Sequence, residues 1–306
     1  MVAGGMAGGG GTVASDPRWL AAGAAGLLSS VLALWAFRGM PLGAAAMWLI
    51  PLPLFVAGLG FGPAALLAGV AIATLVLTLS ATNLAIGVFL SAFGLPVAVL
   101  GLAWAARRGE LSASFALLGL VPAGGILAAA LALSGSEGGL EGAMRQAAET
   151  ALARMGLPAG GGLVDELVRV KAAAIGFWLS IALLANAALA GRIVARLGLA
   201  PAPQWREARL PRLYPALPAA AALVWLLMAG EGDAVPLSVT LALLVPVFLL
   251  GLSAVHRRTQ GLRGRGMLLG LLYGLLIILT VPTAMFAAGF GLYDHWARRA
   301  APPTTT

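Results

Sequence analysis

The sequence has no cysteine, a single lysine and few charged side chains of either sign. Without cysteine the chain has no disulfide, no thiolate metal ligand and no cysteine nucleophile. Charged residues make up 10% of the 306 residues, against about 25% in a soluble domain. We therefore expect most of the chain to lie out of contact with water.

Acidic residues are missing from the long apolar segments, and the familiar catalytic patterns are missing altogether. Carriers that couple to protons or sodium keep carboxylates inside the bilayer, where a charge is costly and is retained for work. The sequence therefore disfavours transport coupled to protons or sodium through an internal carboxylate. There is no HExxH motif, no Walker lysine motif, no Ser-His-Asp order and no His or carboxylate cluster with metal-ligand spacing. We predict no enzyme activity, no cofactor and no metal site.

What the chain has in abundance is apolar sequence, at 60% hydrophobic residues and a mean hydropathy of +0.97. Several segments exceed the ~18 apolar residues that mark a spanning helix. A backbone in lipid must satisfy its own hydrogen bonds, so these segments should be helical. The sequence predicts an all-α, polytopic transmembrane helix bundle of about eight or nine helices, with the lipid bilayer as its surroundings. Nine apolar runs give the expected helices as 19–37, 42–59, 62–80, 83–105, 113–133, 172–195, 214–230, 236–255 and 267–290.

The count stays open between eight and nine, because 42–59 and 62–80 are short and joined without a polar loop, and 214–230 is a marginal span. Residues 1–17 are expected to form a flexible glycine-rich tail, 18–300 a single transmembrane domain, and 301–306 a disordered tail.

The connection between the fifth and sixth helices predicts an amphipathic helix. Arg145 and its acidic neighbours Glu141 and Glu149 are spaced for i,i+4 pairs, and Gly156 and Pro158 should end the helix. An interfacial helix lying on the membrane is preferred to a substrate lid. Residues 163–174 should run on into 172–195. The apolar stripe of this helix comprises Leu140, Met144, Ala148, Ala151 and Met155.

Basic residues gather in the short loops, and all but Lys171 are arginine. With nine helices three of these loops share a side, which should be cytoplasmic together with Arg18 and the N-terminus. Glu231 and Asp233 would face the other side. Arg298 and Arg299 would also fall there with nine helices, whereas an eight-helix count would move them. This bias explains the pI of about 11.3, so nucleic acid is not an expected partner. The loop arginines are Arg107, Arg108, Arg192, Arg196, Arg206, Arg209, Arg212, Arg257, Arg258, Arg263 and Arg265.

Residues 51–69, PLPLFVAGLGFGPAALLAG, combine two prolines with closely spaced glycines and carry no polar side chain. A phosphate loop would need a nearby Lys, Ser or Thr. The i,i+4 spacing of small residues instead allows close helix packing. Prolines inside a helix remove hydrogen bonds and free carbonyls, which protein, water or a ligand must satisfy. Packing and a solute pocket both remain open for Pro51, Pro53, Gly58, Gly60 and Gly62.

Asn186 is the most polar side chain within an expected span, and its amide needs hydrogen-bond partners that lipid does not supply. It should bond another helix, which is the preferred interpretation, or a solute in a wet cavity. Convergence of Asn186, Tyr273 and His256 around a cavity would favour an intramembrane enzyme. Near the C-terminus, Asp294 and Arg298 are spaced as an i,i+4 pair.

PLPLFVAGLGFG and the C-terminal GLYDHWARR resemble a bacterial membrane family with a domain of unknown function numbered 2232, which includes the YybS-like proteins. The resemblance implies a multi-pass protein of the bacterial cytoplasmic (inner) membrane. The helix pattern is remotely similar to the S components of energy-coupling-factor vitamin transporters and to the rod-shape protein MreD. S components dock a membrane coupling protein through small residues of their first helix. The matching positions in AAGAAG are Ala21, Ala22, Ala25 and Gly26, for which packing within this chain is the preferred alternative.

Two functions follow as hypotheses. The first is a solute-binding transporter subunit resembling an S component, with a membrane coupling protein as its partner. The alternative is a non-transporting cell-envelope scaffold resembling MreD, with envelope proteins as partners.

Overall fold

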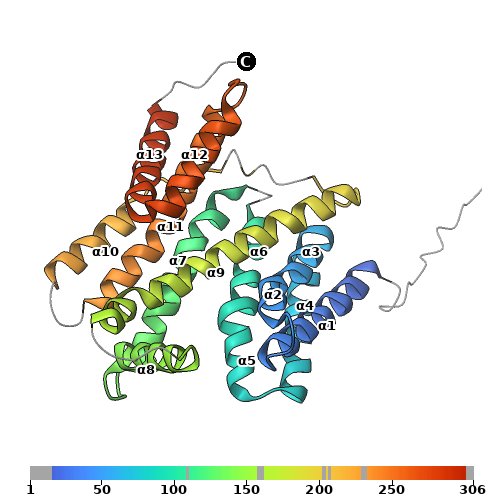
Figure 1. The fold of residues 1–306 in the computed structure, drawn as a ribbon. Helices are drawn as coiled ribbons and strands as arrows, with labels where there is room; N and C mark the ends of the chain where they lie inside the picture. The colour runs from blue at the N-terminus through green and yellow to red at the C-terminus, as the bar shows by residue number, and fades with distance from the viewer. Residues whose placement is uncertain are drawn as a thin grey trace, which may run out of the picture. The chain divides into compact units, whose positions relative to one another are not determined.

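The chain is a bundle of helices with no strand in the part described by the computed structural model, which covers residues 16–107, 110–156, 162–201, 205, 208–228 and 233–300 (Figure 1). Within these ranges, seven helical segments are long and apolar enough to cross a membrane. The predicted all-α, multi-pass architecture is confirmed. Of the predicted tails, all but Asp16 and Pro17 falls outside the described residues, and Pro17 already belongs to the first helix.

The candidate spans follow the predicted runs closely. Two further apolar helices are shorter: α10 (Ala216–Leu227) has 12 residues and α12 (Arg265–Ile278) has 14. At 1.5 Å per residue α12 is about 21 Å long, less than the ~30 Å hydrocarbon core. The spans are Pro17–Phe37, Gly43–Phe61, Pro63–Ser80, Asn83–Ala106, Leu111–Ala132, Leu167–Arg196 and Ala234–Arg258.

Contacts divide the chain into two compact units: unit 1 is residues 1–105 with 185–202, and unit 2 is 106–184 with 203–306. Helix α9 (Gly162–Arg196) contributes to both. It is continuous from 162, as predicted for the segment 163–174.

Unit 1 is built around α1 (Pro17–Phe37), which packs on α2 (Gly43–Leu49), α3 (Pro51–Phe61) and α4 (Pro63–Ser80). Asp16 starts α1 by accepting a hydrogen bond from the backbone N of Arg18 at 2.9 Å, with Pro17 in the first turn. The predicted proline kink is present, because α2 ends at Leu49 and α3 begins at Pro51.

The fourth span is interrupted by one wide turn. Helices α5 (Asn83–Phe89) and α6 (Leu95–Ala106) are joined by a π-helical turn, Leu90–Gly94. Pro96 follows this turn and has no N–H to continue an α-helical ladder. A widened turn is one way for a helix to accommodate that missing bond.

Unit 2 is organised around α11 (Ala234–Arg258), which packs on α7 (Leu111–Ala132), α10 and α13 (Thr280–Ala300). Its buried side is continuous along most of its length. Ser180 of α9 ties that helix to α7 by donating to the Leu118 carbonyl at 2.6 Å.

Helix α8 (Gly139–Arg154) lies between α7 and α9 in sequence, as predicted, but its register differs in detail. Its buried residues are Leu140, Ala148 and Leu152, whereas the predicted Ala151 and Met155 are exposed. The buried side of α8 is rotated about the helix axis relative to the predicted stripe, because Leu152 packs with the first turns of α9.

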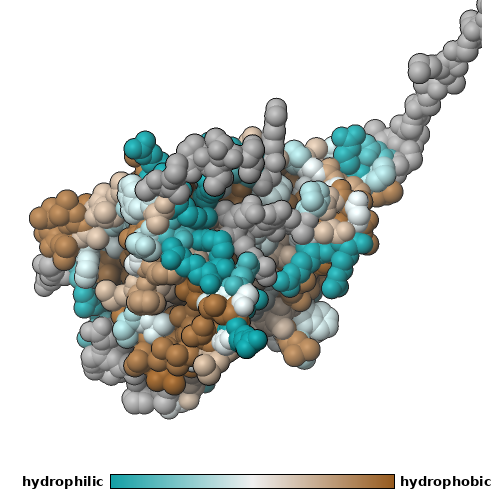
Figure 2. Space-filling model, turned by 90° about the horizontal axis from the view of Figure 1, so that it is seen from above, coloured by the Kyte–Doolittle hydropathy of each residue, from teal (hydrophilic) through white to brown (hydrophobic). Residues whose placement is uncertain are grey.

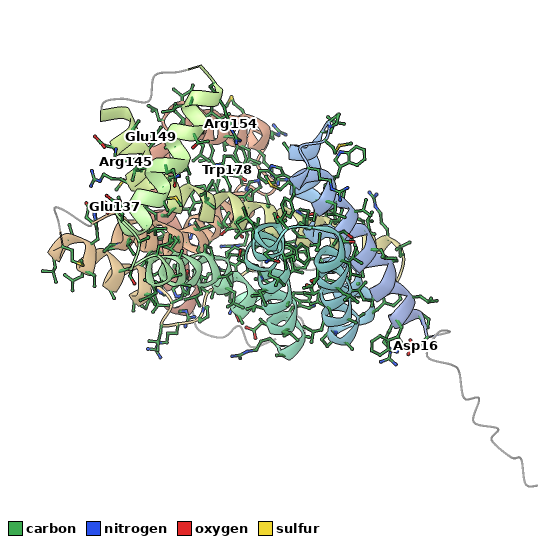
Figure 3. All side chains as sticks on the ribbon, turned by 90° about the horizontal axis from the view of Figure 1, so that it is seen from below. Asp16, Glu137, Arg145, Glu149, Arg154 and Trp178 are labelled. Carbon is green, nitrogen blue, oxygen red and sulfur yellow. The ribbon has the colours of Figure 1, made fainter. Side chains whose placement is uncertain are left out.

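The charged side of α8 also differs from the prediction. Arg145 donates to Asp165 of α9 at 2.7 Å, in place of the predicted ion pairs with Glu141 and Glu149. Arg145, Glu149 and Arg154 project from the helix in Figure 3. The two glutamates still act on Arg145 at longer range, and the Asp165 hydrogen bond is the largest cause of its raised pKa.

The predicted continuous helix 267–290 is wrong, because the chain breaks at Leu279 between α12 and α13. Pro282 lies in the first turn of α13, where its missing N–H and the restriction it places on the preceding residue favour a new helix start. Thr283 donates its hydroxyl to the Leu275 carbonyl at 3.2 Å across the break, and the same carbonyl also accepts from the Leu279 backbone N at 2.7 Å. The two helices lie side by side in Figure 1.

This break changes the expected topology. It brings the C-terminal end of α13 beside the C-terminal end of α11, where Asp294 contacts Arg257. Arg298 and Arg299 therefore lie at the same end of unit 2 as the arginines of the loop after α11. The nine-helix count placed these two arginines on the opposite side and the eight-helix count did not, and the structure differs from the nine-helix count here.

Candidate functional site

The break between α2 and α3 is the first candidate site, and polar side chains from two other helices hold it. Ser29 of α1 is fully buried and donates to the Ile50 carbonyl at 2.8 Å. Asn186 of α9 donates its side-chain N–H to the Trp48 carbonyl at 2.7 Å. Protein groups thus satisfy two carbonyls at the kink, and Asn186 links helices as the preferred interpretation predicts.

Pro51 and Pro53 are both buried at this break, and the glycines after them are packed by leucines. A Cβ added to Gly58 would lie 3.2 Å from Leu66, and one added to Gly60 would lie 3.2 Å from Leu199. Gly62 has a different role, since its φ of +93° forms the turn into α4 and suits only glycine. These glycines allow close packing and a tight turn.

The small residues of α1 are occupied inside the chain. Ala22 and Ala25 are buried, and Gly26 faces α4 so closely that an added Cβ would lie 2.7 Å from the Gly69 carbonyl oxygen. Ala21 is partly buried. Ala22, Ala25 and Gly26 thus take part in packing within the chain, which was the preferred alternative.

Two of the polar residues named for an intramembrane enzyme lie together in unit 2. The Tyr273 hydroxyl lies 3.5 Å from His256 Nε2, and their rings meet edge to face. Asn186 belongs to unit 1, where it bonds Trp48.

The second candidate site is a carboxylate surrounded by arginines where α11 and α13 end. Asp294 is 1% exposed. Its Oδ2 accepts from Arg257 at 2.6 Å and lies 2.8 Å from Arg298 Nε, which confirms the predicted i,i+4 pair. Arg258 reaches Oδ1 at 3.5 Å. Three guanidinium groups share one carboxylate, which leaves the cluster positively charged.

The C-terminal end of α13 also contacts the segment that precedes α10. Arg298 donates to the Ala208 carbonyl at 3.0 Å and Arg299 to the Leu210 carbonyl at 2.9 Å. His295 hydrogen-bonds the backbone of Arg212. The carbonyls of Ala208 and Leu210 therefore both face α13. Arg209 and Arg212 are thereby held beside the cluster.

Burial and charge act together on the titratable groups here. Burial is the main cause that lowers the pKa of His295, and the nearby charges of Arg299 and Arg298 lower it further. His295 Nε2 is buried and has no hydrogen-bond partner among the described residues. Burial and the Arg257 charge also lower the pKa of Arg298. Both pKa values are lowered because positive side chains lie close together and are partly shielded from water.

The opposite end of α11 carries a smaller polar cluster. Asp233 precedes α11 and accepts from Arg169 of α9 at 2.7 Å and from the Trp225 indole N–H at 3.2 Å. The Arg169 hydrogen bond is the largest cause of its lowered pKa. Asp233 thus lies at the end away from Arg257, as predicted. Glu231, Arg108 and Arg206 fall outside the described residues.

Helix α12 presents an open small-residue face. Gly266, Gly270 and Gly274 recur every four residues, and an added Cβ at each would meet nothing within 4 Å among the described atoms. No residue of α12 is buried. Sequence reasoning missed this stripe, although the spacing in GMLLGLLYG was there to be read.

The sequence did not predict that three arginines contact Asp294, because only its pair with Arg298 follows from the i,i+4 spacing along a helix.

Comparisons with protein-family models, curated proteins and solved structures found no match.

Proposed function

We propose that this chain is a multi-pass membrane scaffold that binds a helix of another membrane protein through α12. The observation that carries the proposal is the open glycine stripe of Gly266, Gly270 and Gly274 on a helix with no buried residue. Its expected location is the bacterial cytoplasmic membrane, with the N-terminus and the arginine loops on the cytoplasmic side. Its expected partner is a cell-envelope membrane protein.

The physical reason lies in how helices associate in lipid. Lipid tails are as apolar as leucine, so apolar side chains alone give no preference for protein over lipid. Small residues in an i,i+4 row let two backbones approach and gain dispersion contacts. In α1 and α4 the chain uses such residues internally, as Gly26 and Gly69 show. The glycines of α12 have the same spacing, but no helix among the described residues packs against them.

The first hypothesis, a solute-binding subunit, keeps one supporting observation. A kinked span with buried Ser29 and Asn186 at the break resembles the discontinuous helices of transporters. However, Ser29 and Asn186 spend their donors on carbonyls of the chain itself, and the neighbouring Gly58 and Gly60 are packed by leucines. The geometry therefore favours the scaffold. The resemblance to the family with the domain numbered 2232 stays a prediction.

Photo-crosslinking in native membranes tests the scaffold. A photoreactive residue replaces Leu271, which is 59% exposed beside the glycine row. We expect an adduct with a cell-envelope membrane protein, and its loss when Gly270→Leu fills the row. The matched control is Gly87→Leu, since Gly87 also has nothing within 4 Å of an added Cβ. Adducts that survive Gly270→Leu unchanged would contradict the proposal.

Ligand binding separates the two functions. The purified protein is heated with a panel of vitamins, and the scaffold predicts no shift of the unfolding midpoint. A shift that Asn186→Leu abolishes would instead favour the solute-binding subunit.

A further inference from the structure

Positive charge is concentrated where three distant segments of unit 2 meet. Among the described residues, 208–212, 255–265 and 291–300 together contain eight arginines and one acidic residue, Asp294, in a chain of net charge +8. The described contacts join these segments at one end of α11 and α13. They bring Arg257, Arg258, Arg298 and Arg299 together around Asp294 and the chain before α10.

These arginines are held in position by fixed protein groups. Asp294 holds Arg257, Arg258 and Arg298, and backbone carbonyls hold Arg298 and Arg299. The guanidinium of Arg258 also lies over the Phe290 ring, 5.2 Å from its centroid. An anion that binds here meets donors that are already oriented, so little side-chain entropy is lost on binding.

Exposed donors remain. The Arg258 side chain is 46% exposed although it reaches Asp294, and each guanidinium has five N–H groups. Arg299 and Arg212 are also exposed. One carboxylate can neutralise only one of the three arginines that touch it, so the cluster has both charge and donors for a further anion.

The cluster lies at the depth of lipid headgroups. Its Arg257 and Arg258 end a 25-residue apolar span, so they mark the boundary of the hydrocarbon. Tyr293 and Trp296 of α13 are 59% and 54% exposed beside it. Tyr and Trp are enriched at the membrane interface because one end of each ring system is apolar and the other is polar. Figure 2 shows hydrophilic surface next to hydrophobic surface on the upper face.

We propose that the arginine cluster around Asp294 binds the phosphate of an anionic phospholipid headgroup. Guanidinium groups match phosphate oxygens with two parallel hydrogen bonds. The exposed apolar and aromatic side chains of α13, including Phe286 and Tyr293, lie along the helix where the acyl chains of the same lipid would run.

The experiment measures lipid binding to the purified full chain by native mass spectrometry, with phosphatidylglycerol against phosphatidylcholine. Phosphatidylglycerol should bind more tightly, and Arg258→Gln should weaken it about fivefold, the effect of one basic side chain at an anionic surface. Arg258→Lys keeps the charge but not the two parallel donors, so it should restore only part of the loss. The matched control is Arg145→Gln, because Arg145 is 48% exposed and also ion-paired but lies on α8.

Arg212→Gln is a second test that leaves the Asp294 pairs intact. Its backbone contact with His295 does not need the side chain, so the variant should fold and still bind phosphatidylglycerol more weakly. Equal binding of the two lipids, or an equal loss in Arg145→Gln, would overturn the proposal. So would inorganic phosphate that competes away the lipid at low millimolar concentration, since the site would then take a free anion.

Discussion

The contact between α11 and α13 provides a direct test of the packing of unit 2. Gly251 and Gly291 lie against each other where the helices cross, and Gly291→Ala places a methyl group 2.7 Å from Gly251 N and 3.1 Å from Gly251 Cα. It would also overlap the Val247 carbonyl oxygen. The obstructing atoms are backbone, so a rotamer change cannot relieve the contact.

The cost can be worked from these distances. Restoring an ordinary separation of about 3.4 Å requires the helices to move apart by roughly 0.7 Å, given the 2.7 Å contact. A gap of this size forfeits a quarter to a half of each dispersion contact along the crossing. Overpacking of this kind costs about 1–3 kcal/mol. The better helix propensity of alanine returns about 0.5–1 kcal/mol.

The matched control is Gly289→Ala, two residues away on α13, where an added Cβ meets nothing within 4 Å. It gains the propensity without the clash. The propensity gain is common to both variants and cancels, so we expect Gly291→Ala to be about 1–3 kcal/mol less stable than Gly289→Ala. Unfolding in mixed micelles of a mild detergent and SDS, followed by tryptophan fluorescence, measures the difference. Equal stability of the two variants would refute the close approach of α11 and α13.

Three further perturbations have defined outcomes. Asn186→Leu removes the bond to Trp48 and should lower the free energy of unfolding by about 1 kcal/mol, measured by the same titration; no loss would contradict a linking role. Because the pKa of His295 is lowered in the fold, the unfolded chain binds more protons below its ordinary value of 6.5. Stability should therefore fall as the pH drops below about 6.5 and level off below the folded pKa. His295→Asn should flatten this pH dependence. An unchanged pH dependence would show that His295 is not its cause. Arg145→Gln should leave the unfolding midpoint unchanged, because both side chains of its pair with Asp165 are about half exposed, and a large loss would show that this pair is more buried than described.

The sequence predicted the positions of most helices because hydrocarbon leaves a helix as the solution for a long apolar run. It also predicted the kink at Pro51, since the effect of proline on a helix is local. The break at Leu279 was missed although Pro282 is its signal, because LLIILTVPTAMF reads as one uninterrupted apolar run. The apolar composition of this segment therefore hid the helix-breaking effect of Pro282.

The candidate site was less predictable. Ser29 and Asn186 were recognisable as polar residues in spans, but their carbonyl partners depend on which helices pack together. The same holds for Arg257 and Asp294, which are 37 residues apart. Their pairing follows from the parallel ends of α11 and α13, which exist only because the chain breaks at Leu279.

The hairpin of α12 and α13 bears on how the chain is inserted. From Gly266 to Tyr293 it contains no charged residue, and the arginines that follow it lie with those at the end of α11. Moving an arginine through the bilayer centre costs about 2.5–3.5 kcal/mol even on the translocon scale. The hairpin can enter the bilayer and return to the surface it left without carrying any ionised group across, so its insertion requires no charge transfer through the hydrocarbon core.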